Sequence, residues 1–236
     1  MTAPAADRDR AGAPLAVVTG ASSGIGLAVV QRLLADGWRV LGASRRRPAV
    51  DHPDFTWRRT DLASPADVGA LLDAVPALDA VVHAAGVLRA APLGALSAEV
   101  GEQLWRLHVQ APTQLVNGLV GRLRDGGRIA LIGSRTSSGA AGKSQYAASK
   151  AALVGLARSW AMELAPRGIT VNVVAPGPTD TPMLVDPERA HLPARTPPLG
   201  RFVQPGEVAG LVAYLLGPDG GSLTGQQLVV CGGASL

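Results

Sequence analysis

The chain has 236 residues, 47% of them hydrophobic, and carries a formal net charge of +4 at neutral pH. This length and apolar content suffice for one domain with a full core, and the single cysteine, Cys231, excludes an internal disulfide. Aromatic residues make up only 3% of the chain and the arginines are scattered, so the basic balance does not predict a nucleic-acid partner. No stretch reaches the roughly 18 uncharged apolar residues of a membrane span, and we expect a cytoplasmic protein with no membrane partner.

Residues 1–13 contain acids and arginines without an apolar core, so we expect a flexible N-terminal tail followed by one domain over 14–236. Beyond the tail, short β-branched runs alternate with amphipathic segments, and the first of these segments ends before Gly37, a typical helix stop. The predicted strands cover 14–20, 38–44, 55–62, 78–86, 127–134, 169–177 and 226–233, and the predicted helices cover 25–36, 65–75, 97–123, 147–165 and 205–216.

This alternation predicts an α/β fold, because strands that are apolar on both faces need helices on both sides of the sheet. We therefore expect a single doubly wound, Rossmann-like domain with a seven-stranded parallel sheet. Sheets of this kind bind ligands at the carboxyl ends of their strands.

A glycine-rich turn, TGASSGIG at 19–26, connects the first predicted strand to the first predicted helix. Its glycines Gly20, Gly24 and Gly26 let the backbone approach a ligand closely. The free N–H groups and the dipole at the start of a helix bind anions, and a pyrophosphate fits such a site. Since the turn lies between a strand and a helix, it predicts a dinucleotide cofactor.

The G-x-x-x-G-x-G spacing of this turn resembles the cofactor signature of the short-chain dehydrogenase/reductase family, and of its NADP-dependent ketoreductases in particular. The resemblance extends from residue 15 to the C-terminus. Further matches follow in the family's order: Asp61-Leu62, AAG at 84–86, Ser134 at the end of the fifth strand, YAASK at 146–150 and PGPTDT at 176–181.

The end of the second strand indicates which dinucleotide is bound. In dinucleotide folds an acid about 20 residues past the glycines binds the ribose 2′-hydroxyl, and it would repel a 2′-phosphate. Here Ser44 takes that position and is followed by Arg45, Arg46 and Arg47. A guanidinium binds phosphate through charge-assisted hydrogen bonds, so we expect NADP(H); the alternative is an ordinary solvated arginine loop.

By the resemblance, Asp61 and Leu62 lie against the adenine, Gly86 lies close to the ribose, the backbone near Thr179 meets the carboxamide and Thr181 meets a phosphate. The complete set of expected cofactor-binding residues is Gly20, Ser22, Ser23, Gly24, Ile25, Gly26, Ser44, Arg45, Arg46, Asp61, Leu62, Ala85, Gly86, Tyr146, Lys150, Pro176, Gly177, Thr179 and Thr181.

Tyr146 and Lys150 are four residues apart on a predicted helix and so share one of its faces. The resemblance implies that Tyr146 donates a proton to the substrate's carbonyl oxygen, and that Lys150 lowers the pKa of this phenol and binds the nicotinamide ribose. Ser134 would donate a hydrogen bond to the same oxygen. Ser134 precedes Tyr146 by 12 residues, one fewer than in many relatives, and Ser137 and Ser138 are weaker candidates for its role.

His108 stands where the family's catalytic constellation usually has an asparagine. Two interpretations remain open: His108 holds a water and relays protons, or it is a packed helix histidine without a proton role. His83, in HAAG, is expected to be structural. No residue is predicted to bind a metal.

The predicted function is NADPH-dependent reduction of a ketone to a secondary alcohol, or the reverse oxidation. The alternatives are an epimerase or dehydratase of the same family, and a non-catalytic NADP-binding regulator. The proline-rich segment 182–203 is expected to cover the substrate. By the resemblance, the protein forms a homotetramer or a homodimer.

Overall fold

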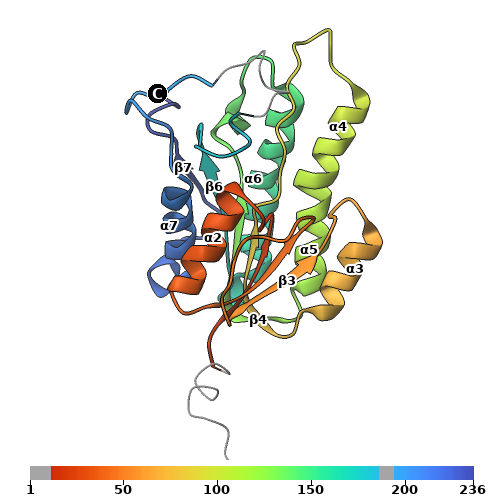
Figure 1. Ribbon diagram of the computed structural model, residues 1–236, viewed down its shortest axis with the longest axis vertical. Helices are drawn as coiled ribbons and strands as arrows, with labels where there is room; N and C mark the ends of the chain where they lie inside the picture. The colour runs from red at the N-terminus through yellow and green to blue at the C-terminus, as the bar shows by residue number, and fades with distance from the viewer. Residues whose placement is uncertain (1–11, 186–193) are drawn as a thin grey trace, which may run out of the picture.

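The computed structural model describes residues 12–185 and 194–236, so most of the expected tail lies outside the described residues (Figure 1). Seven parallel strands form one sheet in the order β3-β2-β1-β4-β5-β6-β7. The predicted fold class is therefore confirmed. The strands are β1 (Leu15–Thr19), β2 (Arg39–Ser44), β3 (Phe55–Arg59), β4 (Leu78–His83), β5 (Leu123–Ile132), β6 (Thr170–Pro176) and β7 (Gln227–Val230).

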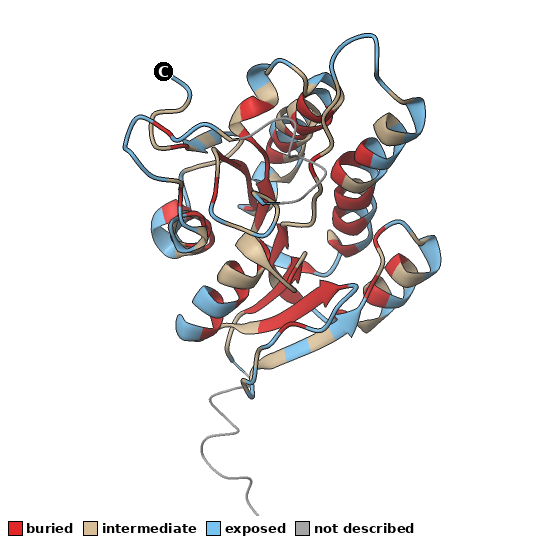
Figure 2. Ribbon diagram, turned by 45° about the horizontal axis from the view of Figure 1, so that its top comes forward, coloured by how far each residue is buried: buried red, intermediate tan, exposed pale blue. Residues whose placement is uncertain are grey.

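Helices cover both faces of this sheet, because its central strands are apolar on both sides (Figure 2). One core packs α2 and α7 against the sheet, and the other packs α3, α5 and α6 against its opposite face. The helices are α2 (Gly24–Ala35), α3 (Pro65–Ala74), α4 (Ala98–Trp105), α5 (Ala111–Leu119), α6 (Ser144–Leu164) and α7 (Pro205–Leu216), with short 3₁₀ turns at Arg135–Ser138, Ala165–Arg167 and Pro218–Gly220.

The predicted single helix over 97–123 is wrong in two respects. A π-helical stretch, η1 (Arg106–Gln110), separates α4 from α5. Pro112 explains it, because a proline lacks the N–H that the carbonyl of His108 would accept in a regular α-helix. The helix also ends at Leu119, since Leu123 already pairs with Leu78 as the first residue of β5.

The carboxyl ends of the strands meet at one edge of the sheet, where the order reverses between β1 and β4. The predicted strands 55–62, 78–86 and 226–233 extend beyond the observed ones, because their last residues belong to the loops at this edge. A ligand is expected at such a reversal point. In the described part of the chain, no helix is both long and apolar enough to span a bilayer.

Candidate active site

A cavity of about 1410 Å³ opens at this carboxyl edge and is lined by the loops that follow β1, β2, β4, β5 and β6. Every residue that the sequence assigns to the cofactor lines it, and so does Ser134. His108 does not. Residues from distant parts of the sequence thus share one cavity, as expected for loops at the ends of parallel strands.

The glycine turn brings the backbone of β1 and α2 into close contact. Gly20 and Gly24 have φ angles of +69° and +56°, a region that favours glycine. A Cβ on Gly26 would lie 2.2 Å from the carbonyl oxygen of Gly20. Ser23 precedes α2 with no capping bond from its side chain, and the first turn carries no acid. The start of α2 therefore suits an anion.

The arginines after β2 have two different environments. Arg45 and Arg46 are exposed and line the cavity, whereas Arg47 lies over the ring of Trp57, 5.9 Å from its centroid, and does not line it. Ser44 holds this turn: its Oγ donates to the carbonyl of Arg46 at 2.7 Å and accepts from Nε1 of Trp57 at 3.1 Å. Trp57 was not identified from the sequence. The available signal was its place on the predicted strand that follows the one ending at Ser44.

Thr19 was also missed, although a hydroxyl at the end of a buried strand was visible in the sequence. Its Oγ1 accepts hydrogen bonds from the backbone N–H groups of Ala84 and Ala85, at 3.2 and 3.3 Å. With both lone pairs used, the hydroxyl donates to Nδ1 of His83 at 3.0 Å. Burial, and to a lesser extent the charge of Lys150, lowers the pKa of His83 to about 3. These contacts fit the expected structural role of His83.

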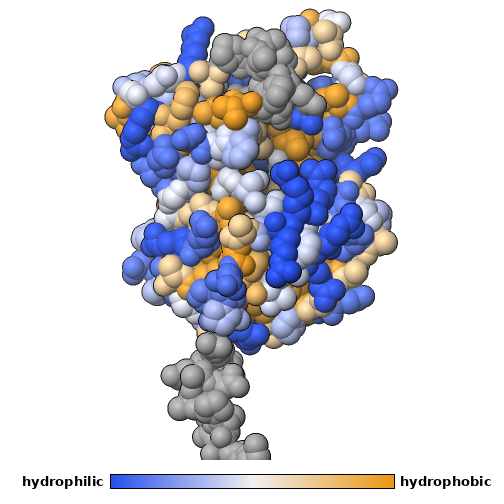
Figure 3. Space-filling view, viewed as in Figure 1, coloured by the Kyte–Doolittle hydropathy of each residue, from blue (hydrophilic) through white to orange (hydrophobic). Residues whose placement is uncertain are grey.

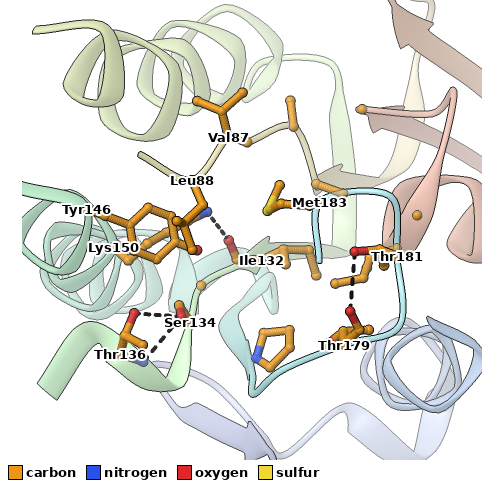
Figure 4. A pocket seen from close by; sticks show the side chains of 18 of the residues that line it. Val87, Leu88, Ile132, Ser134, Thr136, Tyr146, Lys150, Thr179, Thr181 and Met183 are labelled. Carbon is orange, nitrogen blue, oxygen red and sulfur yellow. Dashed lines mark hydrogen bonds between the residues drawn. The ribbon is translucent and has the colours of Figure 1, made fainter. Parts of the chain in front are cut away.

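Tyr146 and Lys150 lie side by side on α6, at one wall of the cavity (Figure 4). Both are buried, with 7% and 4% of their surface exposed. The Lys150 ammonium donates to the carbonyl of Ile132 at 2.7 Å. Burial lowers the pKa of Lys150 to about 7. The helical spacing thus places a phenol and a lysine with a depressed pKa together, in a partly dry environment.

Ser134 lies at the end of β5 and is paired with a second hydroxyl. Its Oγ accepts from the backbone N–H of Thr136 at 3.2 Å and lies 2.9 Å from Oγ1 of Thr136 (Figure 4). The two alternative serines are directed elsewhere: Oγ of Ser137 accepts from Gln227, and Ser138 is exposed and bonds to the carbonyl of Arg135. Only Ser134 among the three lines the cavity. Thr136 was not identified from the sequence.

His108 is fully buried in η1, behind the cavity wall, and its ring packs edge-on against Tyr146 with centroids 5.5 Å apart. Its Nε2 accepts from the N–H of Val87 at 3.2 Å, and its Nδ1 lies 2.9 Å from Oγ of Ser149. The Ser149 hydroxyl in turn donates to the carbonyl of Tyr146 at 2.8 Å. His108 therefore connects the loop after β4 to the helix that carries Tyr146.

The directions of these bonds fix the protonation state of His108. A backbone N–H can only donate, so Nε2 carries no proton, and a carbonyl can only accept, so the Ser149 proton is committed. Nδ1 must then donate to Oγ of Ser149, which makes the imidazole neutral. Burial holds the pKa of His108 far below its ordinary value, and the charge of Lys150 adds to this effect. The geometry favours the interpretation as a packed histidine over that of a proton relay.

The remaining expected residues complete the wall. Asp61 accepts from the N–H of Ala63 at 3.0 Å through Oδ1. Thr179 and Thr181 lie across the cavity from Tyr146 (Figure 4), and the Thr181 hydroxyl donates to the carbonyl of Thr179 at 3.4 Å. Of the expected cover, 186–193 lies outside the described residues; Met183, Leu184, Arg195 and Pro197 among the described ones line the cavity.

Comparison with known proteins identifies the family of this chain. Residues 20–235 match the family model described as Enoyl-(Acyl carrier protein) reductase. A curated relative, the putative ketoacyl reductase of Streptomyces coelicolor, is 36% identical over 255 residues, which cover 93% of this chain and 96% of the relative.

Two solved structures extend the likeness to three dimensions. A short chain dehydrogenase family protein from Francisella tularensis has a TM-score of 0.87 at 27% identity, over 94% of this chain and 98% of that one. A variant of actinorhodin polyketide ketoreductase with NADPH has a TM-score of 0.83 at 32% identity, over 94% and 97%. With its sheet order, glycine turn and paired Tyr146 and Lys150, the chain belongs to the short-chain dehydrogenase/reductase family of oxidoreductases.

Proposed function

We propose that this protein uses NADPH to reduce a ketone to a secondary alcohol, and that it catalyses the reverse oxidation when the alcohol and NADP⁺ are supplied. The observation that carries the proposal is the buried pair of Tyr146 and Lys150 beside Ser134, in a cavity at the carboxyl edge of a parallel sheet. The ketoacyl reductase relative and the ketoreductase solved with NADPH support the same reaction class.

The residues present fit NADP(H). Gly24 and the uncapped start of α2 would bind the pyrophosphate, since their N–H groups have no competing side-chain cap. Arg45 and Arg46 would bind the 2′-phosphate, because two exposed guanidinium groups border the cavity and Ser44 leaves no acid to repel it. Asp61 and Leu62 would contact the adenine.

The bound cofactor supplies the hydride, and the protein controls the proton and the charge on oxygen. In reduction, the Tyr146 hydroxyl donates its proton to the substrate oxygen. The Ser134 hydroxyl donates a hydrogen bond to the same atom and stabilises the charge that develops there. For this, Ser134 must direct its own proton at the substrate, and Thr136 then donates to Oγ of Ser134. The Lys150 ammonium favours the phenolate that remains.

We assign His108 to positioning rather than to proton transfer. A relay would need a nitrogen free to take up a proton, and both ring nitrogens are committed to Val87 and Ser149. Through these bonds and its edge-on contact with Tyr146, the ring fixes the phenol relative to the loop after β4. His108 would therefore position Tyr146 and would not exchange protons with solvent.

We also propose that the protein acts in the cytoplasm. We expect it to form a homotetramer, or else a homodimer. The support for the assembly is an edge strand: among the described residues β7 pairs only with β6, and Val229 on it is 48% exposed. An apolar strand at the edge of a sheet needs a partner or a cover. Light scattering that shows a monomer at micromolar concentration would refute this assembly.

Substituting the two tyrosines of the chain tests the proposed chemistry. Tyr146→Phe should keep the fold and NADPH binding but lose about 10²–10⁴-fold in kcat, the range typical of general acid catalysis. Tyr214→Phe is the matched control, because Tyr214 is exposed on α7. Turnover is measured as NADPH oxidation against keto esters, aromatic ketones and polyketide-like ketones. NADPH binding without turnover on any ketone would favour a regulator, and product formation without net NADPH oxidation would favour an epimerase or a dehydratase.

A further inference from the structure

Charged side chains from three segments line the cavity beyond the residues assigned to the cofactor. On the basic side they are Arg89, Arg106, Arg135, Lys143 and Arg195, and on the acidic side Glu99 and Glu102. Among the described residues that line this part of the cavity, cations therefore outnumber acids. The space-filling view does not single out these residues; it shows hydrophilic and hydrophobic side chains intermixed over one face of the molecule, with a block of hydrophilic ones near its centre (Figure 3).

Arg135 differs in its burial from Arg106 and Arg195, two other cations of this group. Arg106 and Arg195 are exposed to water, whereas Arg135 is partly buried and its Nε is shielded from solvent. Within 12–185 and 194–236, its guanidinium makes no hydrogen bond and no ion pair. Arg128 provides a contrast, because its Nε is also buried but its Nη1 donates to the carbonyl of Gly127 at 3.1 Å.

The backbone places Arg135 directly after Ser134. It begins the 3₁₀ turn Arg135–Ser138, whose first carbonyl accepts from the Ser138 hydroxyl at 3.2 Å. The turn is further held by the bond between Thr136 N–H and Oγ of Ser134. Arg135 therefore lines the cavity from a backbone position that these bonds fix, one residue after the serine whose hydroxyl would meet the ketone oxygen.

A partly buried cation without a partner is unfavourable unless a ligand neutralises it. The planar guanidinium fork matches the two oxygens of a carboxylate or a phosphate. We infer that the substrate carries such an oxyanion close to its ketone, and that Arg135 binds it. The inference rests on the proposed function and narrows its substrate class to keto acids or keto phosphates.

The test compares ketones that carry an oxyanion with a ketone that carries none. Acetoacetate and its methyl ester share one ketone, and dihydroxyacetone phosphate is the phosphate arm. The wild-type protein should show a higher kcat/KM for the acid or for the phosphate than for the ester. In Arg135→Met this preference should fall at least about tenfold, mainly through KM, because a charged hydrogen bond is lost. Arg135→Lys should keep part of it, and Arg158→Met, an exposed arginine of α6 outside the cavity, should keep all of it.

Binding separates this inference from the proposed reaction. Calorimetric titration of acetoacetate and of dihydroxyacetone phosphate into the protein with NADP⁺ needs no turnover. Tighter binding of one anion to the wild type than to Arg135→Met supports the inference, even if no ketone is reduced. Equal affinities in both proteins, or an acid-to-ester preference that Arg135→Met leaves intact, would overturn it. Thermal unfolding of the three variants checks that they are folded.

Discussion

The two ends of the cavity are built in different ways. The cofactor end comes mainly from one continuous stretch, 19–46, and depends on backbone shape: glycines at close contacts and an uncapped helix start. The catalytic end combines side chains from the loop after β4, the turn after β5 and α6. Side chains at this end are buried and already bonded to one another, as Ser134 is to Thr136. Backbone shape thus defines the first end, and tertiary contacts between side chains define the second.

The substitution expected to change both cofactor binding and stability tests the role of backbone shape. Gly26→Ala should raise the Kd for NADPH at least tenfold and cost about 1–3 kcal/mol of unfolding free energy, because the new Cβ would meet the carbonyl of Gly20 at 2.2 Å. Gly69→Ala on α3 is the control: a Cβ there meets nothing within 4 Å, so the helix should gain about 0.4–1 kcal/mol. Fluorescence titration and thermal unfolding measure both. Normal NADPH affinity in Gly26→Ala would contradict the conclusion that backbone shape defines the cofactor end.

At the cofactor end, side chains should decide only whether NADPH or NADH is preferred. Replacing Arg45 and Arg46 by alanine should lower kcat/KM with NADPH about 10- to 100-fold relative to NADH, through the loss of charge-assisted bonds. Arg47→Ala should change the ratio little, since Arg47 lies over Trp57 outside the cavity lining. Steady-state kinetics with both cofactors give the ratio. A wild-type preference for NADH would contradict the assignment at once.

The pH dependence of NADPH binding tests Lys150, which is assigned both to cofactor binding and to catalysis. Burial lowers the pKa of Lys150 to about 7, so in the cofactor-free protein the ammonium is present below that pH and lost above it. NADPH affinity should therefore decrease above about pH 7, by up to tenfold per pH unit, and binding at pH 8 should take up protons. Calorimetry in two buffers of different ionisation enthalpy measures this uptake. Lys150→Met should bind NADPH weakly and without this pH dependence. If the NADPH affinity of the wild type does not change with pH, the proposed role of the Lys150 ammonium is contradicted.

The smallest effect separates positioning from proton transfer at the catalytic end. His108→Asn should stay within about threefold of the wild type in kcat, whereas His108→Leu should lose roughly tenfold, because the Val87 N–H would be left unpaired at a cost of about 1–3 kcal/mol. The wild-type kcat profile from pH 5 to 9 should show no inflection due to His108. An inflection near pH 6–7 that disappears in His108→Asn would instead identify a relay.

Local sequence was sufficient for much of this molecule. Alternating strand and helix patterns predicted the parallel sheet, because a strand that is buried on both faces is apolar at consecutive positions. Glycines between a strand and a helix indicated the anion site, and the four-residue spacing of Tyr146 and Lys150 placed both on one face of α6. These features depend on neighbours in sequence, so they can be read without the fold.

What sequence reasoning missed depends on residues far apart in the chain. Trp57 holds Ser44 only because β2 and β3 are paired, and Thr19 meets Ala84 only across β1 and β4. The bonds of His108 to Val87 and Ser149 likewise need the complete fold, so the sequence left two interpretations open. The helix break was the exception, since Pro112 was visible and its effect on the carbonyl of His108 was predictable.

The loop after β4 has a consequence for local opening motions. It has no regular secondary structure, yet the amides of Ala84 and Ala85 donate to Thr19 and that of Val87 donates to His108. Acceptors from the end of β1 and from a buried ring thus replace a strand partner. These three amides should exchange with deuterium as slowly as those of the sheet, so the start of the loop, 84–87, should belong to the most stable cooperative unit of the protein.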